Sequence, residues 1–277
     1  MSSLDRMLTI LDLFDENLMS IQLDHAIQAT GASKATAYRY IQSLCHRGLL
    51  APAAGGSYVL GPRVIELDRL VRKMDPLLSS ASPLIRAAGS RLNVNIMLCS
   101  FYGDKVMCAD LAWPDASIEQ TYERGRPMPM FRGAMAKIIL ANLTPYQLRS
   151  IMLWHAEGIR EAGLGENWEE FRSRMSKLRR AGFCMSRAEV FPGLIGISAP
   201  IFDADQRVLG SVVFIIPEER YDADPGAPYQ AAIIELAASI TSDIAKRSAG
   251  SPAGAGRAAR PRKARAAGRE LAEKGAA

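Results

Sequence analysis

The residues of this sequence best suited to chemistry lie on one face of a short predicted helix. Ala37, Ile41 and Leu44 recur at i, i+4 and i+7, which predicts a helix with one buried stripe. The opposite face is polar, short-chained and free of carboxylates, as a helix that enters a major groove must be. The candidate DNA contacts on or beside this face are Ser33, Lys34, Thr36, Tyr38, Arg39, Gln42, Ser43 and Arg47.

Neighbouring elements must hold that helix in place. Apolar residues at helical spacing predict a helix within residues 3–15 and a second one that runs from about residue 20 or 22 to Thr30. Gly31 ends the second helix, and Ser33 caps the third. Two short apolar runs around a Gly-rich turn at residues 52–56 then predict a β-hairpin. Three helices followed by a hairpin is the order of a winged helix-turn-helix.

The distribution of charge supports a phosphate-facing surface in this module. Residues 1–24 hold five acids and one base, whereas residues 25–63 hold four bases and no acid. Such segregation suits contact with phosphate, because each contacted phosphate favours a nearby cation. The overall net charge of +5 is a separate feature, since residues 249–277 carry seven bases and two acids and residues 1–248 are neutral. The alternative is a generic three-helix packing module with a solvated polar face.

The rest of the sequence predicts a second domain of mixed α and β structure. We divide the chain into a winged helix-turn-helix domain over 1–61, a connecting helix over 62–75, an α+β domain over 76–248 and a disordered basic tail over 249–277. The strands expected in the α+β domain are 93–102, 105–113, 118–124, 195–202 and 208–216, and its expected helices are 76–91, 134–142, 145–154, 169–180 and 229–246.

Several classes of protein are excluded by composition. No apolar run approaches the roughly 18 residues needed to span a bilayer, and the acidic N-terminal stretch is unlike a signal peptide. The four cysteines and three histidines are scattered, which argues against a disulfide framework or a zinc site. We therefore expect a cytoplasmic protein with no cofactor, no metal and no membrane partner.

Several motifs, in order, resemble those of the IclR-type transcriptional regulators. In the N-terminal part they are Arg6-Met-Leu-Thr-Ile-Leu-Asp-Leu-Phe, the segment Thr30-Gly-Ala-Ser-Lys-Ala-Thr-Ala-Tyr-Arg-Tyr-Ile-Gln-Ser-Leu and Tyr58-Val-Leu-Gly. In the C-terminal part, Gly125-Arg-Pro-Met-Pro-Met-Phe-Arg-Gly-Ala-Met-Ala and Glu189-Val-Phe-Pro-Gly-Leu-Ile-Gly-Ile-Ser-Ala-Pro are similar to the family's effector-domain signatures. The resemblance covers about residues 3–248.

The resemblance implies a transcriptional repressor or activator that binds double-stranded operator DNA as a dimer or a dimer of dimers. It also implies a GAF-like C-terminal domain with a curved antiparallel sheet that holds a small-molecule effector, often a carboxylic acid. The apolar strand Val212-Val-Phe-Ile-Ile departs from relatives that bind small polar acids, so we expect an effector with an apolar or aromatic part.

The resemblance also implies which residues form the effector pocket. Met97, Cys99 and Met130 are alternatively plain core residues, and Arg132, like Arg126, is alternatively a surface or dimer-contact residue. Gly133 and Ala134, at a helix start, would offer free backbone N–H groups to an anion. The candidate effector contacts are Met97, Cys99, Asp110, Met130, Arg132, Gly133, Ala134, Glu189, Gly196 and Ser198.

A second class of function is an enzyme, and a third is a ligand sensor whose DNA module is vestigial. A serine or cysteine hydrolase needs a nucleophile, a base and an orienting group. His25 and His46 fall in the winged module, and His155 lies at a predicted helix end with no nucleophile motif. We therefore expect no catalytic residues, and the alternative to a DNA-binding regulator is a small-molecule-binding sensor or enzyme without specific DNA binding.

Overall fold

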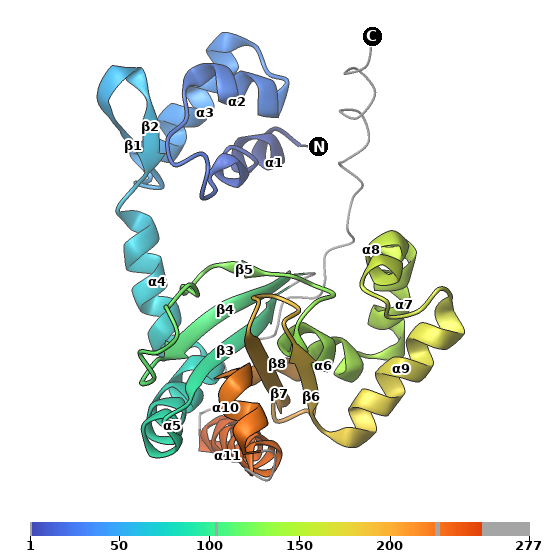
Figure 1. The fold of residues 1–277 in the computed structure, drawn as a ribbon. Helices are drawn as coiled ribbons and strands as arrows, with labels where there is room; N and C mark the ends of the chain where they lie inside the picture. Colours follow the sequence, from blue (N-terminus) through green and yellow to red (C-terminus); the bar gives the residue numbers. More distant parts are fainter. Residues whose placement is uncertain (1, 103–104, 225–227, 251–277) are drawn as a thin grey trace. The chain divides into compact units, whose positions relative to one another are not determined.

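The computed structural model describes residues 2–102, 105–224 and 228–250. The chain forms two compact units, Met1–Asp75 and a second that begins at Pro76, and each is described by itself (Figure 1). The expected two-domain α+β class is confirmed by this architecture. The tail expected to be disordered, 249–277, lies outside the described residues from position 251 onward.

The N-terminal unit is a three-helix module with a two-stranded wing. Its core is made of apolar residues from all of its parts, among them Ile10, Ile21, Ile41 and Leu50, each at most 1% exposed. The elements are α1 (Ser3–Leu8), a 3₁₀ turn (Leu11–Leu13), α2 (Leu23–Thr30), α3 (Lys34–His46), β1 (Leu50–Pro52), a second 3₁₀ turn (Ala54–Gly56), β2 (Tyr58–Leu60) and α4 (Arg63–Met74).

Local signals place α2 and α3 where the sequence predicts them. Gly31 ends α2 in the left-handed conformation, with φ 61°, which glycine adopts at little cost. The Ser33 hydroxyl accepts a hydrogen bond from the Thr36 backbone N–H and so caps α3. The single helix expected within 3–15 is wrong in detail, because α1 ends at Leu8 and a 3₁₀ turn follows.

The wing is a β-hairpin tied to the helices by one extra pair of hydrogen bonds. β1 and β2 are antiparallel, with Leu50 opposite Leu60. Ile21, just before α2, exchanges two backbone hydrogen bonds with Tyr58 of β2, at 2.9 and 2.8 Å. The wing is therefore fixed against the start of the helix-turn-helix.

Helix α4 carries an apolar face that its own unit does not cover. Ile65 and Met74 are 74% and 73% exposed, and no residue of α4 is buried. Uncovered apolar area of this size on a regular helix is typical of a surface that meets a partner. The other exposed apolar residues of α4 are Val64, Leu67, Leu70 and Val71.

The second unit is built on one six-stranded antiparallel sheet. The strand order is β5-β4-β3-β8-β7-β6, so β3 and β8 pair at its centre and β7 pairs with the other edge of β8. The strands are β3 (Asn95–Tyr102), β4 (Lys105–Ala112), β5 (Pro127–Met128), β6 (Cys184–Arg187), β7 (Leu194–Phe202) and β8 (Val208–Pro217). The helices are α5 (Pro76–Leu92), α6 (Ala134–Asn142), α7 (Pro145–Trp154), α8 (Ala156–Glu161), α9 (Trp168–Ala181), α10 (Glu218–Ala223) and α11 (Tyr229–Gly250).

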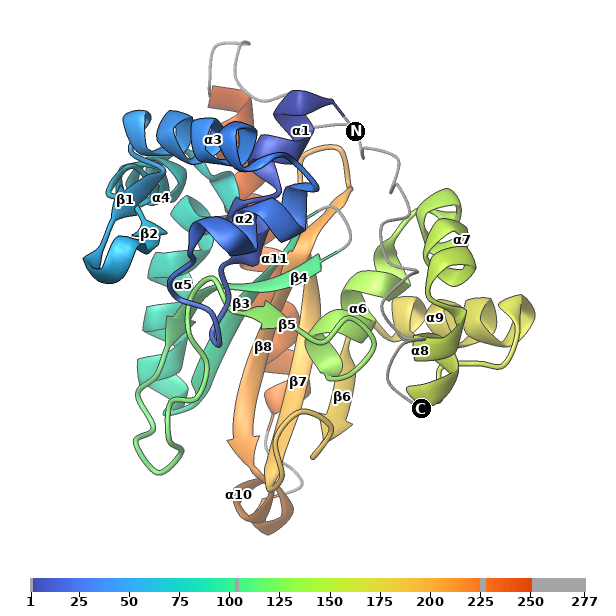
Figure 2. The same ribbon diagram turned by 90° about the horizontal axis from the view of Figure 1, so that it is seen from above.

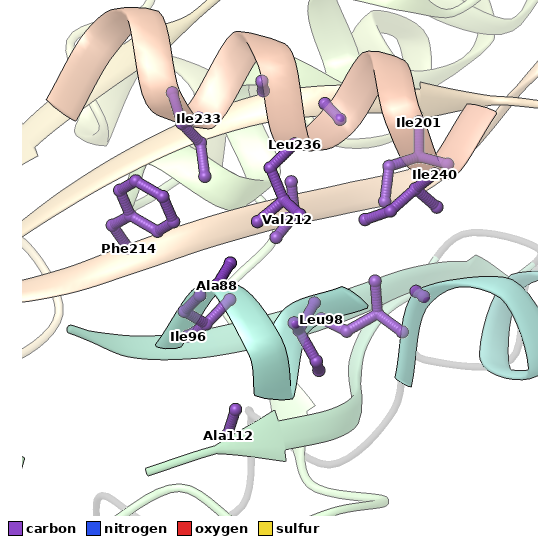
Figure 3. Packing of buried hydrophobic residues seen from close by; sticks show 14 of the residues in the cluster. Ala88, Ile96, Leu98, Ala112, Ile201, Val212, Phe214, Ile233, Leu236 and Ile240 are labelled. Atoms are coloured by element: carbon purple, nitrogen blue, oxygen red, sulfur yellow. The ribbon is translucent and has the colours of Figure 1, made fainter. Parts of the chain in front are cut away.

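Helices cover the two faces of the sheet differently. On one face α5 and α11 form the main core, in which Ile233, Leu236 and Ile240 of α11 meet Val212 and Phe214 of β8 (Figure 3). On the other face α6 packs over β7 and β8, and α7, α8 and α9 gather beside it (Figure 2). Side chains alternate along a strand, so Val212 and Phe214 of β8 point into the core beneath α5 and α11. Val213 and Ile215 point to the opposite face of the sheet.

Two kinds of prediction for this unit need correction. The strand expected at 118–124 is absent; this segment is an irregular loop in which the Trp113 indole N–H donates to the Ile118 carbonyl, and only Pro127–Met128 adds to the sheet. The predictions from sequence also omitted α8, α10 and β6, which are only four to six residues long. Short elements carry too few periods to stand out.

Among the described residues, no helix has both the length and the apolar character needed to cross a membrane.

Candidate functional site

The polar face of α3 is positioned by the apolar stripe behind it. Ala37, Ile41 and Leu44 are buried in the core of the N-terminal unit, as predicted. The helix therefore turns its other side to solvent. The candidate contacts that are exposed are Ser33, Lys34, Tyr38, Arg39, Gln42, Ser43 and Arg47, while Thr36 is half-buried.

The polar groups of this face fall into two sets. Ser33 and Thr36 hydrogen-bond to each other at 3.0 Å, and the Ser43 hydroxyl donates to the Arg39 carbonyl at 2.9 Å. Their hydroxyls thus serve the helix itself. The second set has no hydrogen bond or ion pair to any residue that the structure describes, and it comprises the side chains of Lys34, Arg39, Gln42 and Arg47.

An unpartnered Arg and Gln one turn apart are suited to base recognition. Arg39 can donate two parallel hydrogen bonds to guanine, and Gln42 can both donate to and accept from adenine. Lys34 and Arg47, near the two ends of the helix, can neutralise phosphates. No acid stands among these four side chains.

A second candidate site is a cavity in the C-terminal unit, between the α6 start, the sheet and residues 189–194. The free space inside it is small, about 30 Å³, so a ligand larger than a water molecule requires its walls to move apart. Five of the ten predicted effector contacts line it, namely Met97, Gly133, Ala134, Glu189 and Gly196. These five come from β3, the start of α6, the 188–193 loop and β7.

The other five predicted effector contacts lie elsewhere. Asp110 of β4 accepts from the Ser82 hydroxyl of α5 and pairs with Arg86 at 3.5 Å, on the far face of the sheet. Ser198 is fully buried, and its hydroxyl donates to the Val212 carbonyl. Cys99 and Met130 are core residues beside the cavity and not in its wall, and Arg132 is exposed.

Two backbone N–H groups at the start of α6 are engaged within the protein. The Gly133 N–H donates to Glu189 Oε2 at 2.9 Å, and the Ala134 N–H donates to the Ser186 hydroxyl at 2.9 Å. Lys137, one turn into α6, donates to both Glu189 oxygens at 2.6 Å. The expectation that these two N–H groups are free for an anion is therefore wrong, because the Glu189 carboxylate accepts from one and the Ser186 hydroxyl accepts from the other.

Gly133 is needed for this arrangement. Its φ of 82° lies in a region that other residues rarely adopt, and a Cβ there would come within 2.8 Å of Val190 Cγ2. The loop after Glu189 is in turn closed by a hydrogen bond from the Ala188 N–H to the Leu194 carbonyl. The α6 start and the 188–193 loop thus fit together as one wall of the cavity.

A cluster of aromatic side chains, which the sequence did not predict, completes the wall of the cavity. Tyr122 and Phe191 both line the cavity and meet edge to face, with ring centroids 4.9 Å apart, and Trp113 lies 5.9 Å from Tyr122. Tyr122 lies in the segment misread as a strand. The apolar sequence of β8 was the one indication of an apolar wall, since Val213 and Ile215 of β8 line the same cavity.

The described residues offer no arrangement suited to nucleophilic or metal chemistry. Burial raises the pKa of the Cys108 thiol to about 12 and that of Cys99 well above its usual value, so both thiols stay protonated near neutral pH. The His25 Nδ1 accepts a hydrogen bond from the Gln22 backbone N–H at the start of α2. No group of three or more His, Cys, Asp or Glu in the described ranges could hold a metal ion.

Family models match both units of the chain. The model described as the IclR helix-turn-helix domain matches residues 3–53, and that of the bacterial transcriptional regulator IclR C-terminal domain matches residues 70–242. Among curated relatives, the Pca regulon regulatory protein of Pseudomonas putida is 25% identical over 213 residues, 76% of this chain and 73% of that protein. The transcriptional repressor IclR of Escherichia coli is 22% identical over 251 residues, 86% of this chain and 88% of that protein.

Solved structures share the fold. An IclR homolog from Microbacterium hydrocarbonoxydans, complexed with 4-hydroxybenzoate, is similar with a TM-score of 0.70 at 19% identity, over 88% of this chain and 99% of that one. The IclR transcriptional regulator of Alicyclobacillus acidocaldarius is similar with a TM-score of 0.71 at 17% identity, over 87% of this chain and 98% of that one. These relatives are regulators, and no enzyme family is indicated.

Proposed function

The chain belongs to the IclR family of bacterial transcriptional regulators, and from that premise we propose that it is a sequence-specific operator-binding protein that reads DNA with α3. The observation that carries the proposal is the exposed, carboxylate-free face of α3, on which Lys34, Arg39, Gln42 and Arg47 have no partner among the described residues. Arg39 and Gln42 face base edges, and Lys34 and Arg47 meet phosphates.

Two copies of the chain act together on the operator. The uncovered apolar face of α4 supports pairing of two N-terminal units about a two-fold axis. Two copies of α3 then enter successive major grooves, about 34 Å apart, of a near-palindromic site. The dimer, or a pair of such dimers, is the form in which the chain represses or activates transcription.

A small metabolite with an apolar or aromatic part controls the affinity for the operator. The supporting features are the wall formed by Tyr122, Phe191, Val213 and Ile215 and the 4-hydroxybenzoate bound in the structure of a relative. The metabolite acts by its different affinity for two arrangements of the dimer that differ in the spacing of the α3 helices.

The resemblance also implies a carboxylate on the effector. A carboxylate directed at the Gly133 N–H or at Lys137 would have to displace Glu189, because that side chain accepts from both groups. The apolar part of the effector is therefore the part that this chain's residues support.

Operator binding is tested by gel retardation with the DNA upstream of this protein's own gene. We expect salt-sensitive retardation that a random duplex of equal length does not compete away. Equal affinity for both duplexes, or none, would instead favour a small-molecule sensor without specific DNA binding.

A further inference from the structure

A larger hollow lies in the C-terminal unit where the loop after β4, the 188–193 loop and the start of α10 meet. Its free space is about 580 Å³, part of it open to solvent, which is within the range of small-molecule sites. We call this hollow the α10 groove. It shares Phe191 and Leu194 with the cavity beside the α6 start, and the rest of its lining is separate.

Hydrogen bonds hold the walls of the α10 groove together. Arg220 of α10 pairs with Asp115 of the loop after β4 at 3.3 Å. The fully buried Asn95 side chain donates to the Asp115 carbonyl and accepts from the Asp115 N–H, both at 2.9 Å. The Glu218 N–H donates to the Gly193 carbonyl at 2.9 Å and so joins α10 to the 188–193 loop. The groove is therefore formed before a ligand enters it.

The charged groups of the α10 groove leave two carboxylates unpaired. Of the described residues that line it, three are acids and one is a base. Asp115 is neutralised by Arg220 and also accepts from the Ser117 hydroxyl at 2.6 Å. Glu119 and Glu219 are exposed, and their carboxylates have no hydrogen bond or ion pair to any described residue. An uncompensated negative charge therefore faces the space of the groove.

The rest of the lining is mostly apolar. Its apolar members are Ile118, Phe191, Pro192, Leu194 and Pro217. An apolar floor with a few charged groups is typical of a site in which the floor supplies affinity and the charges select the ligand. Two carboxylates are too few for Ca²⁺, which takes about six to eight oxygen ligands. An organic cation suits this lining better than a metal ion.

We propose that the α10 groove is a second ligand site of the C-terminal unit and that it binds an organic ammonium ion with an apolar body. The ammonium group donates to Glu119 and Glu219, and the body packs against Phe191, Leu194 and Pro217. Because an exposed pair of opposite charges is worth little alone, the body contributes most of the affinity and the carboxylates contribute the selectivity. The site goes beyond the proposed effector control, since it lies in another place and takes another class of ligand.

Calorimetry of the full chain tests the proposal with three ligands that share a phenylethyl body. They are 2-phenylethylammonium, 2-phenylethanol and 3-phenylpropanoate, which are cationic, neutral and anionic. We expect the ammonium ion to bind about tenfold more tightly than the alcohol, and the carboxylate to bind less tightly than the alcohol. Binding of the ammonium ion that is no tighter than that of the alcohol overturns the proposal, and so does binding of none of the three.

A double variant locates the cation. Glu119→Gln with Glu219→Gln should remove the preference of about tenfold for the ammonium ion and leave the affinity for 2-phenylethanol unchanged. Glu161→Gln with Glu235→Gln makes the same change in net charge at exposed positions outside the groove and should keep the preference. All four side chains are exposed, so both double variants should fold.

Each remaining outcome counts against the site. A preference that survives Glu119→Gln with Glu219→Gln places the ammonium ion elsewhere and overturns the proposal. A preference lost in both double variants is an effect of net charge and overturns it as well. The ratio of affinities does not depend on DNA, so loss of specific gel retardation overturns operator binding and leaves this test intact.

Discussion

Helices α3 and α6 each carry a candidate site, and they begin in different ways. α3 is capped by Ser33, which receives the N–H of a residue three positions later, and its outer face stays free. α6 is capped by Ser186 and Glu189, which lie 52 and 56 positions beyond the N–H groups they satisfy. A local cap leaves the helix surface open to an outside partner such as DNA. The distant cap joins the helix start to a loop of the same unit and places the Glu189 carboxylate at the Gly133 N–H.

The largest expected effect comes from removing the support behind the open face of α3. Ile41→Ala leaves a cavity in the core of the N-terminal unit and should lower its free energy of unfolding by about 2–5 kcal/mol. Urea unfolding followed by far-ultraviolet circular dichroism measures this loss. All three tryptophans lie in the C-terminal unit, so their fluorescence transition should not move.

Ile41→Val is the matched control and should cost only about 0.5–1.5 kcal/mol. A shift of the tryptophan transition in Ile41→Ala would show that α3 and α6 do not unfold in separate units, and it would contradict the comparison of the two helices as independent sites.

A smaller effect is expected on the open face itself. Arg39→Ala should weaken operator binding by about 1–3 kcal/mol and leave the free energy of unfolding unchanged, since Arg39 is exposed and its side chain has no partner among the described residues. Fluorescence anisotropy with labelled operator measures the loss.

Random DNA and the Arg39→Lys variant are the controls for this prediction. A base contact predicts a loss on the operator alone and no rescue by Lys, because Lys lacks the planar fork of Arg. An equal loss on operator and random DNA would assign Arg39 to a phosphate.

The smallest effects compare the two caps directly. Ser186→Ala leaves the buried Ala134 N–H without an acceptor and should cost about 1–3 kcal/mol in the tryptophan transition. Ser33→Ala removes an exposed cap, where water can replace the hydroxyl, and should cost about 0.5–2 kcal/mol in the circular dichroism transition. A larger loss for Ser33→Ala than for Ser186→Ala would contradict the distinction between a local and a distant cap.

The N-terminal unit was the more predictable of the two. The stripe of Ala37, Ile41 and Leu44, the cap at Ser33 and the stop at Gly31 act within one or two helical turns, so the sequence shows them directly. Helices α6 and α7 were likewise predicted to their end residues, because the residues that begin and end them are near one another in the chain. Within 3–15 periodicity misled, because apolar residues at helical spacing also fit a short helix followed by a 3₁₀ turn.

The pocket was less predictable, because its wall is assembled from segments far apart in the chain. The resemblance led to Gly133, Ala134 and Glu189, but it did not indicate that the Gly133 N–H donates to Glu189 or that the Ala134 N–H donates to Ser186. Tyr122 was missed because one buried aromatic in an irregular loop has no period to detect. Asp110 was assigned to the wrong face because the register of β4, which shifts beside Cys99, decides the side to which it points.

The sequence by itself determined the winged module, the acid-free face of α3, the apolar character of β8 and the order of domains that marks the family. Each of these is a property of residues near one another in the chain, and periodicity, capping and charge are sufficient to show it. Only the tertiary structure decided that Glu189 occupies the start of α6 and that Lys137 neutralises it there. That outcome depends on the pairing of β6 with β7, which brings Ser186 and the loop after it to a helix more than fifty residues earlier.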